Sequence, residues 1–416
     1  MTDAAALDPN CLFFAAGEAS GDHYAAAIYR MLHERRPELR ALGLGGAESR
    51  AAGIETCVDL KTVSVMGLVE VLAHYGRLRR AMNALIDALD THRPALVIAI
   101  DFQEFNQRLA RAARARGIPV LFFVAPQVWA WRPKRARRFG EVADHLAVLF
   151  DFEVPLFARY GLPTTHVGHP LRDLIEPELQ RPEDPQSRTV PRNQARQALG
   201  LDTTGTLIGL LPGSRRSEIG RLLPLMLATA DRLLDRHPDW RFALPRAASL
   251  DVDWFAAQIE HAHPSERLRR ALSLIDGNAR RVMTASDTLC IASGTATLEA
   301  ALIGTPMVIT YRTNPLTYFI ARHLVHIERV GLPNIMLGRN AVPELIQGAA
   351  TADHLSDAVT QITMDSSTRV AQIEDLKTVR QHLGDPGALR KLADLAETLL
   401  AGANRGDQRP AEPVRR

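Results

Sequence analysis

The sequence predicts an α/β protein made of two halves, each a parallel β-sheet covered by helices on both faces. Short apolar runs alternate along the chain with amphipathic segments of helical period. These runs are continuously apolar and do not alternate apolar with polar residues as a half-exposed strand does. Such continuous apolar runs are typical of strands buried on both faces. An interruption rich in Pro and charge divides the pattern into two similar series. The runs expected to be strands are 11–16, 95–100, 119–124, 145–150, 206–211, 241–245, 288–293 and 306–310.

The 416 residues are enough for two or three domains. We expect a Rossmann-like domain over residues 1–175, a linker over 176–194 and a second Rossmann-like domain over 195–365. Residues 366–402 are predicted to form helices only. The polar tail 403–416 should be disordered, because it cannot bury enough apolar surface to fold.

The composition is that of an ordinary globular protein, with 46% hydrophobic and 23% charged residues. The net charge of +3 does not favour nucleic-acid binding, which expects a strongly basic domain. Cys11, Cys57 and Cys290 are an odd, scattered set that fits a reducing cytosol. We see neither a signal peptide nor the roughly 18 to 20 apolar residues of a membrane span, so any membrane contact should be peripheral.

The loops that follow the predicted strands are the candidate sites, because open parallel sheets bind ligands at the carboxyl ends of their strands. The loop after 11–16 contains Glu18, Ser20 and Asp22 but lacks the GxGxxG spacing of a dinucleotide site. Ser20 and Asp22 could cap the next helix, whereas a capped turn does not explain Glu18. All three are therefore candidates for contact with a substrate.

Asp101 comes directly after the predicted strand 95–100. A carboxylate in that position can act as a general base toward a substrate hydroxyl. The alternative is a structural cap of the following helix, a common role of Asp. The sequence leaves both roles open.

Two loops of the second half have the character of phosphate sites. Gly213 and Ser214 follow the strand 206–211 and offer backbone N–H groups at a helix start, and Arg215 adds a fork for an anion. The alternative there is a capping box of Ser214 with Ser217 or Glu218.

The other loop follows the strand 288–293, where Ser293, Gly294 and Thr295 open a helix with Glu299 one turn in. That arrangement can hold a diphosphate and leave the carboxylate for ribose hydroxyls, although a plain small-residue turn is the alternative.

Two further stretches could meet lipid or phosphate. The first has a wide apolar face that fits a core helix or an interfacial helix, formed by Val65, Met66, Leu68, Val69 and Leu72. The second has two tryptophans followed by five cations within 132–138, of which Arg132 and Lys134 come first. These cations fit a substrate phosphate, an anionic lipid surface or a solvated basic face.

Eight blocks in register resemble the lipid-A-disaccharide synthase family of outer-membrane biogenesis. They are AGEASGD, SVMGLVEVL, PQVWAWRPKR, VGHPLRD, LLPGSRRSEI, ASGTATLEAAL, YRTNPLTYFIARHLV and VGLPNIMLGRNAVPELIQ. The resemblance implies a GT-B fold, with an acceptor-binding, membrane-facing first domain, a UDP-sugar-binding second domain and a cleft between them. It also implies an inverting glycosyltransferase that needs no metal or other cofactor.

The expected substrates are UDP-2,3-diacylglucosamine and 2,3-diacylglucosamine 1-phosphate, joined into a β-1′,6 disaccharide with release of UDP. The resemblance places the protein on the cytoplasmic face of the inner membrane as a peripheral enzyme, with a homodimer possible and no nucleic-acid partner. Competing readings are another UDP-sugar enzyme of this fold, such as a muramyl-lipid transferase or a UDP-N-acetylglucosamine epimerase. A non-catalytic binding protein on the same fold is a third, since fold does not determine function.

The family's motif residues fall on named positions of this chain. Asp101 takes the place of the base, Arg215 that of a diphosphate ligand, and Asn334 of the LPN motif that of a donor contact. Ser293, Gly294, Thr295 and Glu299 match the UDP loop. Phe102, Gln103 and Glu104 depart from the family's usual Ala-Pro-Asp, so Glu104 could compete for the base role.

Overall fold

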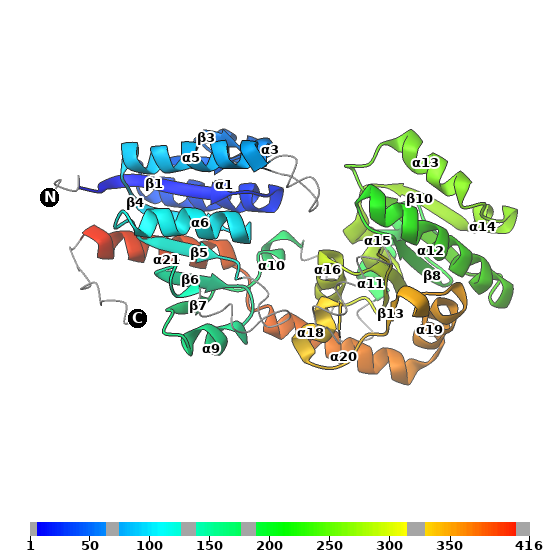
Figure 1. Cartoon of the computed structure of the whole chain (residues 1–416). Coiled ribbons are helices and arrows are strands. Elements are labelled where there is room, and N and C mark those ends of the chain that lie inside the picture. The colour runs from blue at the N-terminus through cyan, green and yellow to red at the C-terminus, as the bar shows by residue number, and fades with distance from the viewer. Residues whose placement is uncertain (1–5, 64–74, 126–138, 176–188, 314–328, 405–416) are drawn as a thin grey trace. The chain divides into compact units, whose positions relative to one another are not determined.

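The computed structural model describes residues 6–63, 75–125, 139–175, 189–313 and 329–404. The chain divides into two compact units. Unit 1 comprises Met1–Pro170 and Leu383–Arg416, and unit 2 comprises Leu171–His382. Each unit is a parallel sheet between layers of helices (Figure 1), which confirms the predicted fold class.

The sheet of unit 1 has seven parallel strands in the order β3-β2-β1-β4-β5-β6-β7. The strands are β1 (Asp8–Ala16), β2 (Arg40–Gly45), β3 (Glu55–Asp59), β4 (Pro94–Ile100), β5 (Val120–Phe123), β6 (His145–Val148) and β7 (Thr164–His166). The helices are α1 (Ala19–Arg35), α2 (Ala47–Ala51), α3 (Leu60–Val63), α5 (Tyr75–His92), α6 (Gln103–Arg114), α9 (Glu153–Ala158) and α21 (Ala388–Asn404). The strand order reverses between β1 and β4, which makes their carboxyl ends the switch point of the sheet.

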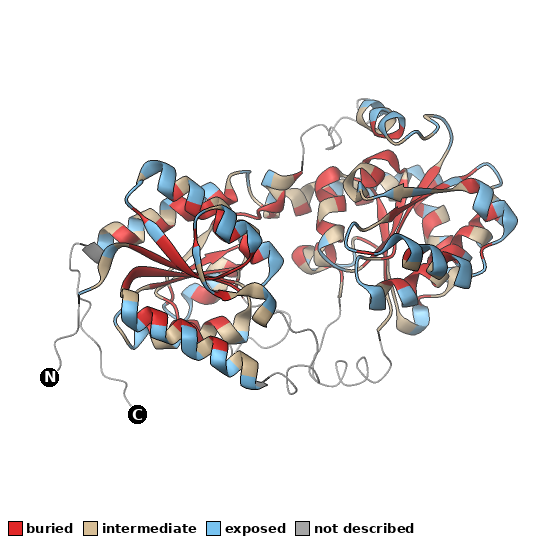
Figure 2. Cartoon of the chain, turned by 90° about the horizontal axis from the view of Figure 1, so that it is seen from above, coloured by how far each residue is buried: buried red, intermediate tan, exposed pale blue. Residues whose placement is uncertain are grey.

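Successive residues of β1 belong to two different cores. Phe13 packs on one face of the sheet with Leu85 of α5 and Leu109 of α6. Phe14 packs on the other face, in the core that α1 and α21 cover. Buried residues accordingly line both sides of the sheet (Figure 2), which explains why its central strands are continuously apolar.

The last helix, α21, packs on unit 1 although it follows unit 2 in the sequence. Its apolar stripe joins the core beside α1 and is formed by Leu389, Leu392, Ala393, Ala396 and Leu400. The backbone N–H of His169 donates to the carbonyl of Leu383 at 3.0 Å, close to where the chain re-enters unit 1. The helices expected over 366–402 are therefore divided between the units, since α20 (Ser366–His382) belongs to unit 2.

The sheet of unit 2 has six parallel strands in the order β10-β9-β8-β11-β12-β13. The strands are β8 (Leu207–Leu211), β9 (Arg241–Arg246), β10 (Leu272–Asp276), β11 (Thr288–Ala292), β12 (Met307–Tyr311) and β13 (Glu344–Ile346). Helices up to the sixth strand are α10 (Leu171–Leu174), α11 (Thr189–Ala198), α12 (Arg216–Arg236), α13 (Val252–His261), α14 (Glu266–Ala271), α15 (Ala279–Ala285), α16 (Thr295–Ile303) and α18 (Leu332–Leu337). The short helix η2 (Gln347–Ala349) and α19 (Ala352–Met364) precede α20. The switch point of this sheet lies between β8 and β11.

The predicted linker is partly wrong. Residues 176–188 lie outside the described residues, but α11 begins at Thr189, inside the range 176–194 that we expected to be a linker. This helix is anchored in unit 2 because Arg196 is fully buried there and donates to Asp287 at 2.8 Å and to the Ala285 carbonyl at 2.9 Å. Unit 2 also begins earlier than expected, at Leu171.

Candidate active site

Asp101 lies at the switch point of unit 1, directly after β4 and beside the end of β1. Its backbone N–H donates to the carbonyl of Phe123 at 2.9 Å. Asp101 and Phe102 have φ values of 49° and 47°, a left-handed conformation that costs free energy and often marks functional sites. Phe102, not Asp101, occupies the N-cap position of α6, so the structural alternative for Asp101 is wrong.

The carboxyl group of Asp101 is half-buried, and burial raises its pKa. Hydrogen bonds from Gln103 and from the backbone of Phe102 oppose that rise but do not cancel it. Gln103 Nε2 lies 3.3 Å from Asp101 Oδ1 and also donates to the carbonyl of Val124 at 2.8 Å. A carboxylate whose pKa is raised is a stronger base than a solvated one. The competing carboxylate, Glu104, is exposed in the first turn of α6.

Asn106 is a positioning residue that the sequence analysis missed. Its side chain is fully buried, and Nδ2 donates to the carbonyls of Ala15 at 2.9 Å, Ile100 at 3.1 Å and Asp101 at 2.8 Å. One amide thus ties the end of β1 to the end of β4 and supports the turn at Asp101. The available signal was a polar residue on the buried face of a helix, because such residues usually have a hydrogen-bonding role.

The loop after β1 differs from expectation in its capping. Helix α1 begins at Ala19, so Ser20 and Asp22 lie inside it and neither caps it. Glu18 is the N-cap residue of α1 and makes no side-chain cap hydrogen bond. Glu18 and Ser20 are exposed at the carboxyl edge of the sheet, directly after β1, which is the neighbour of β4.

Asp22 has a structural role in another helix. Its carboxylate is buried and accepts hydrogen bonds from the backbone N–H groups of Gly46 at 2.6 Å, Glu48 at 3.1 Å and Ser49 at 3.1 Å, and from the Ser49 hydroxyl. Burial alone would raise the pKa of Asp22, but these hydrogen bonds outweigh burial and lower it. Asp22 therefore satisfies the amino end of α2, and its carboxylate is occupied within the protein.

The loop after β8 holds a carboxylate where we expected a phosphate. Glu218 Oε2 accepts from the backbone N–H groups of Ser214 at 3.2 Å and Arg215 at 3.3 Å. Gly213 has a φ of 107°, and a β-carbon there would collide with the Glu218 carboxylate. The N–H of Ser214 is thus occupied by Glu218, and Ser214 is not the capping side chain. The Arg215 guanidinium lies 3.6 Å from Glu218 Oε1 and its side chain is 66% exposed, so a ligand can reach it.

The loop after β11 leaves the start of its helix exposed. Gly294 is the N-cap residue of α16, and Gly294 and Thr295 are exposed there. Glu299 follows one turn later, and its Oε1 accepts from Arg280 Nε at 3.0 Å and Nη2 at 2.9 Å. Arg280 was not among the predicted site residues. Because β8 and β11 are neighbours, this loop and the Arg215 loop emerge from the same edge of the sheet.

Asn334 is buried in α18, and both ends of its amide are bonded within the protein. Nδ2 donates to the carbonyl of Val342 at 2.7 Å and to Glu344 Oε1 at 2.6 Å. Oδ1 accepts from the N–H groups of Ala341 and Val342, each at 2.8 Å. The expected direct contact of Asn334 with the donor does not fit this arrangement, in which the amide holds the loop before β13.

Glu344 connects Asn334 to the predicted donor loop. Its two carboxylate oxygens accept from the backbone N–H groups of Val330 at 2.8 Å and Gly331 at 2.9 Å. The Ser293 hydroxyl in turn donates to the carbonyl of Val330 at 3.1 Å. One hydrogen-bonded network therefore supports Ser293, and it consists of Asn334, Glu344 and the 330–331 turn.

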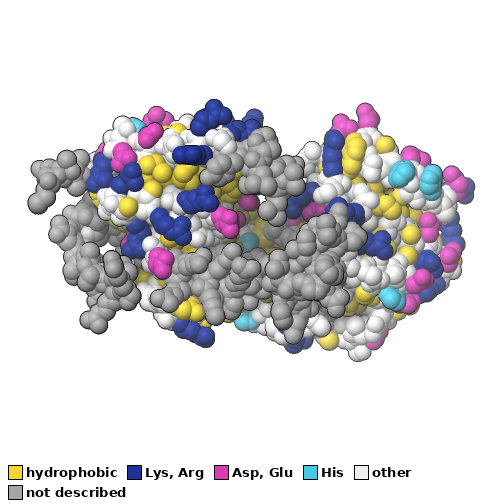
Figure 3. All heavy atoms as spheres, in the orientation of Figure 1, with side chains coloured by type: hydrophobic (Ala, Val, Ile, Leu, Met, Phe, Trp, Pro, Cys, Tyr) yellow, Lys and Arg dark blue, Asp and Glu magenta, His cyan; other side chains and the backbone are white. Residues whose placement is uncertain are grey.

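Two groups of predicted contacts lie outside the described residues. They are the basic residues Arg132 and Lys134 and the apolar residues Val65, Met66, Leu68, Val69 and Leu72. On the face drawn in Figure 3, positive and negative side chains of the described residues are interspersed. No helix in the described part of the chain is both long and apolar enough to cross a membrane.

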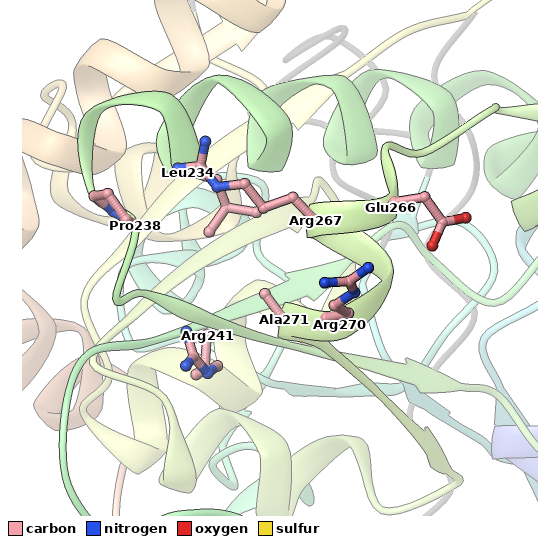
Figure 4. A pocket seen from close by; sticks show the side chains of 7 residues that line it. All are labelled: Leu234, Pro238, Arg241, Glu266, Arg267, Arg270 and Ala271. Carbon is pink, nitrogen blue, oxygen red and sulfur yellow. The ribbon is translucent and has the colours of Figure 1, made fainter.

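A cavity of about 480 Å³ lies in unit 2, near the amino end of strand β9. Its lining includes Arg241, the first residue of β9, and Arg267 and Arg270 of α14 (Figure 4). Gly213 and Ser293 follow the carboxyl ends of their strands, whereas Arg241 marks the amino end of its own. Because open α/β sheets bind ligands at the carboxyl edge, we do not place the active site in this cavity.

Comparison with known proteins agrees with the sequence resemblance. A lipid-A-disaccharide synthase of Geobacter sulfurreducens is 39% identical over 389 residues, covering 94% of this chain and 97% of that protein. One from Nitrosococcus oceani is 38% identical over 391 residues, covering 94% and 96%.

Solved structures with similar folds include a UDP-GlcNAc 2-epimerase from Neisseria meningitidis bound to UDP-GlcNAc. Its TM-score is 0.59 at 14% identity, covering 93% of this chain and 99% of that one. A UGT transferase from Siraitia grosvenorii in complex with UDP has a TM-score of 0.58 at 13% identity, with coverage of 93% and 99%. These likenesses establish the GT-B fold alone. The family described as lipid-A-disaccharide synthetase matches residues 12–396, and the chain belongs to that family.

Proposed function

We propose that the chain transfers 2,3-diacylglucosamine from its UDP donor to 2,3-diacylglucosamine 1-phosphate, forming the β-1′,6 disaccharide 1-phosphate and UDP. The observation that carries the proposal is the similarity to lipid-A-disaccharide synthases over more than nine-tenths of both chains. Among the competing activities, the epimerases resemble this chain at only 14% identity, which concerns the fold and not the reaction.

In the proposed reaction Asp101 is the general base. Its carboxylate takes the proton from the acceptor 6-hydroxyl while that oxygen attacks C1 of the donor sugar. The bond from C1 to the UDP oxygen breaks on the opposite face, so the anomeric centre inverts and the electron pair leaves with UDP. Burial supports this role, because it raises the pKa of Asp101 and so strengthens the base.

Unit 2 supplies the proposed donor site. The exposed guanidinium of Arg215 offsets the charge that builds up on the leaving UDP. Ser293, Gly294 and Thr295 present the amino end of α16 to the diphosphate, and Glu299 accepts from the ribose. Asp101 belongs to unit 1 and Arg215 to unit 2.

The acceptor side and the membrane complete the proposal. Glu18 and Ser20 follow β1, the strand next to β4 and Asp101, and are the described candidates for acceptor contacts. Arg132 and Lys134 would meet the acceptor's 1-phosphate or anionic lipids. The apolar residues Val65, Met66, Leu68, Val69 and Leu72 would meet acyl chains at the cytoplasmic face of the inner membrane, where the protein binds peripherally. Salt should release the protein from vesicles of anionic lipid if the cations provide the attachment.

A homodimer is also part of the proposal. Helix α21 packs on α1 and β4 of unit 1 although it follows unit 2 in the sequence, so a second copy's α21 could occupy the same surface. Sedimentation of the full chain over a range of concentrations tests this association.

The decisive experiment measures UDP release and disaccharide formation with both lipid substrates and with each one alone. Disaccharide and UDP in equal amounts, only when both are present, are expected. UDP-N-acetylglucosamine converted without an acceptor would favour an epimerase. Binding of the substrates without turnover would favour a non-catalytic protein.

A further inference from the structure

Arg280 donates two hydrogen bonds to one carboxylate oxygen of Glu299 and none to the other. Nε and Nη2 of Arg280 in α15 both donate to Oε1 of Glu299, at 3.0 and 2.9 Å. Nη1 of the same guanidinium donates to the carbonyl of Leu174 at 2.6 Å, at the end of α10. All three guanidinium nitrogens are therefore hydrogen-bonded. The bond to Leu174 of α10 holds the guanidinium of Arg280, and the guanidinium in turn holds the carboxylate of Glu299. No hydrogen bond to Oε2 of Glu299 occurs within the described ranges.

Helix geometry directs the remaining oxygen toward the start of α16. Glu299 lies four residues after Thr295, so the two share one face of the helix. Side chains of a helix lean toward its amino end, which brings the Glu299 carboxylate toward the Gly294–Thr295 turn. The side chain of Glu299 is 18% exposed, so the carboxylate is largely covered but still reachable.

A purely structural ion pair would not need this arrangement. Arg280 is 30% exposed, and ion pairs that water reaches contribute little to stability. The planar guanidinium of Arg instead fixes the orientation of the carboxylate that it binds, whereas the single ammonium group of Lys does not. A ribose hydroxyl needs an acceptor whose direction is already fixed, because ordering a loose carboxylate on binding would cost affinity.

We propose that Arg280 is a positioning residue for the ribose of the donor, holding Glu299 so that its Oε2 accepts a hydrogen bond from a ribose hydroxyl. This inference rests on the proposed UDP donor. It adds a residue that does not itself contact the ligand, and it assigns the two carboxylate oxygens of Glu299 to different partners.

The test combines variants of the protein with variants of the ligand. Calorimetry compares UDP with 2′-deoxy-UDP and 3′-deoxy-UDP on the full chain. The wild-type protein should bind UDP about tenfold more tightly than at least one deoxy analogue, as expected for a hydrogen bond to a charged group. Arg280→Gln should lower UDP affinity about tenfold but leave that analogue nearly unaffected, so that the preference for UDP is lost.

The controls separate positioning from general damage. Glu299→Gln should show the same loss of preference, and the double variant should be no worse than either single one, because both remove the same contact. Arg281→Gln changes the neighbouring arginine of α15 and should keep the wild-type preference. If Arg280→Gln folds poorly, Arg280→Lys keeps the charge without the fork and should still lose most of the preference.

The outcomes also separate this inference from the proposed function. A variant at Arg280 that keeps the wild-type preference, or that loses UDP and both analogues by the same factor, overturns the positioning role. A wild-type protein that forms the disaccharide yet binds all three ligands equally overturns it as well. Failure of the wild-type protein to bind UDP at all would remove the proposed donor and this inference together.

Discussion

The ring of Phe102 lies against Gly17, in the place that a β-carbon on Gly17 would occupy. Gly17 is the first residue after β1, and Phe102 follows Asp101 after β4. The two loops of the switch point are therefore packed together without room for a side chain at position 17. Asp101 is part of the same turn, so a shift of Phe102 also moves the proposed base.

Gly17→Ala should reduce kcat/KM by about tenfold to a hundredfold, because a displacement of about 1 Å at a reacting group has effects of that size. The methyl group must push Phe102 away, and the left-handed turn at Asp101 moves with it. Steady-state rates with both lipid substrates measure the effect.

Gly220→Ala is the matched control for that variant. Gly220 lies in α12, and a β-carbon there meets nothing within 4 Å. Removing a helical glycine should leave activity unchanged and raise stability slightly. Equal activity of the two alanine variants would contradict the coupling of Gly17 to Asp101.

Asp101→Asn should lower kcat by a factor of about 10² to 10⁴, the usual contribution of a general base. In the wild-type protein kcat/KM should fall as the pH drops through the raised pKa of Asp101, above the ordinary value of 3.8. The variant should lack that acid limb. Glu104→Gln, an exposed neighbour, should keep both the rate and the limb, and the opposite pattern would transfer the base role to Glu104.

The same substitution should make the protein more stable at neutral pH. Burial raises the pKa of Asp101 in the folded state, so the ionised carboxylate disfavours folding once the pH exceeds the ordinary value of 3.8. The amide of Asp101→Asn carries no charge and avoids this penalty. The difference in free energy of unfolding should shrink as the pH falls toward 3.8. Urea titrations at several pH values measure it, and a variant less stable than wild type at neutral pH would argue against the desolvated carboxylate.

The strands were predictable where burial is continuous and not where it is interrupted. The eight apolar runs are all strands, because a central parallel strand must be apolar on both faces. β2 was missed since Gly43 and Gly45 weaken its pattern, and β10 since its edge position leaves Leu274 exposed. β7 and β13 have three residues each, too short for any period. β3 was also missed, another edge strand with only Val58 buried.

The sequence predicts where the residues of the candidate site lie, but not which side chains are already hydrogen-bonded within the protein. A side chain in the loop after a buried strand must lie at the carboxyl edge, which is the basis for predicting Asp101, Arg215 and Ser293 as site residues. Whether a side chain is available to a ligand depends on contacts distant in sequence. The carboxylate of Asp22 binds the amino end of helix α2, 24 to 27 residues away in the sequence. The carboxylate of Glu299 binds Arg280, which lies 19 positions earlier. Local pattern carries no information on such pairs.

Asn334→Ala should cost about 2 to 4 kcal/mol of stability, because it leaves buried and partly buried groups without their hydrogen bonds. It should also weaken UDP binding, since the network that supports Ser293 loses its central amide. Urea unfolding and calorimetry measure the two effects.

Glu344→Gln provides the comparison for Asn334→Ala. It keeps the shape of the side chain but replaces one accepting oxygen with an NH₂ that faces other donors, so it should show both effects to a smaller degree. Loss of UDP affinity in Asn334→Ala without any loss of stability would instead favour a direct contact between Asn334 and the donor.

Asp22→Asn should destabilise unit 1 by about 1 to 2 kcal/mol at neutral pH, the range found for capping side chains. Hydrogen bonds to α2 lower the pKa of Asp22, so its ionised form stabilises the fold above the ordinary pKa of 3.8. That contribution is lost as the pH falls through the lowered pKa, and the gap between wild type and variant should close there. Because the carboxylate is occupied within the protein, kcat at saturating substrate should change little while the variant is folded. A large fall in kcat with unchanged stability would restore Asp22 to the substrate site.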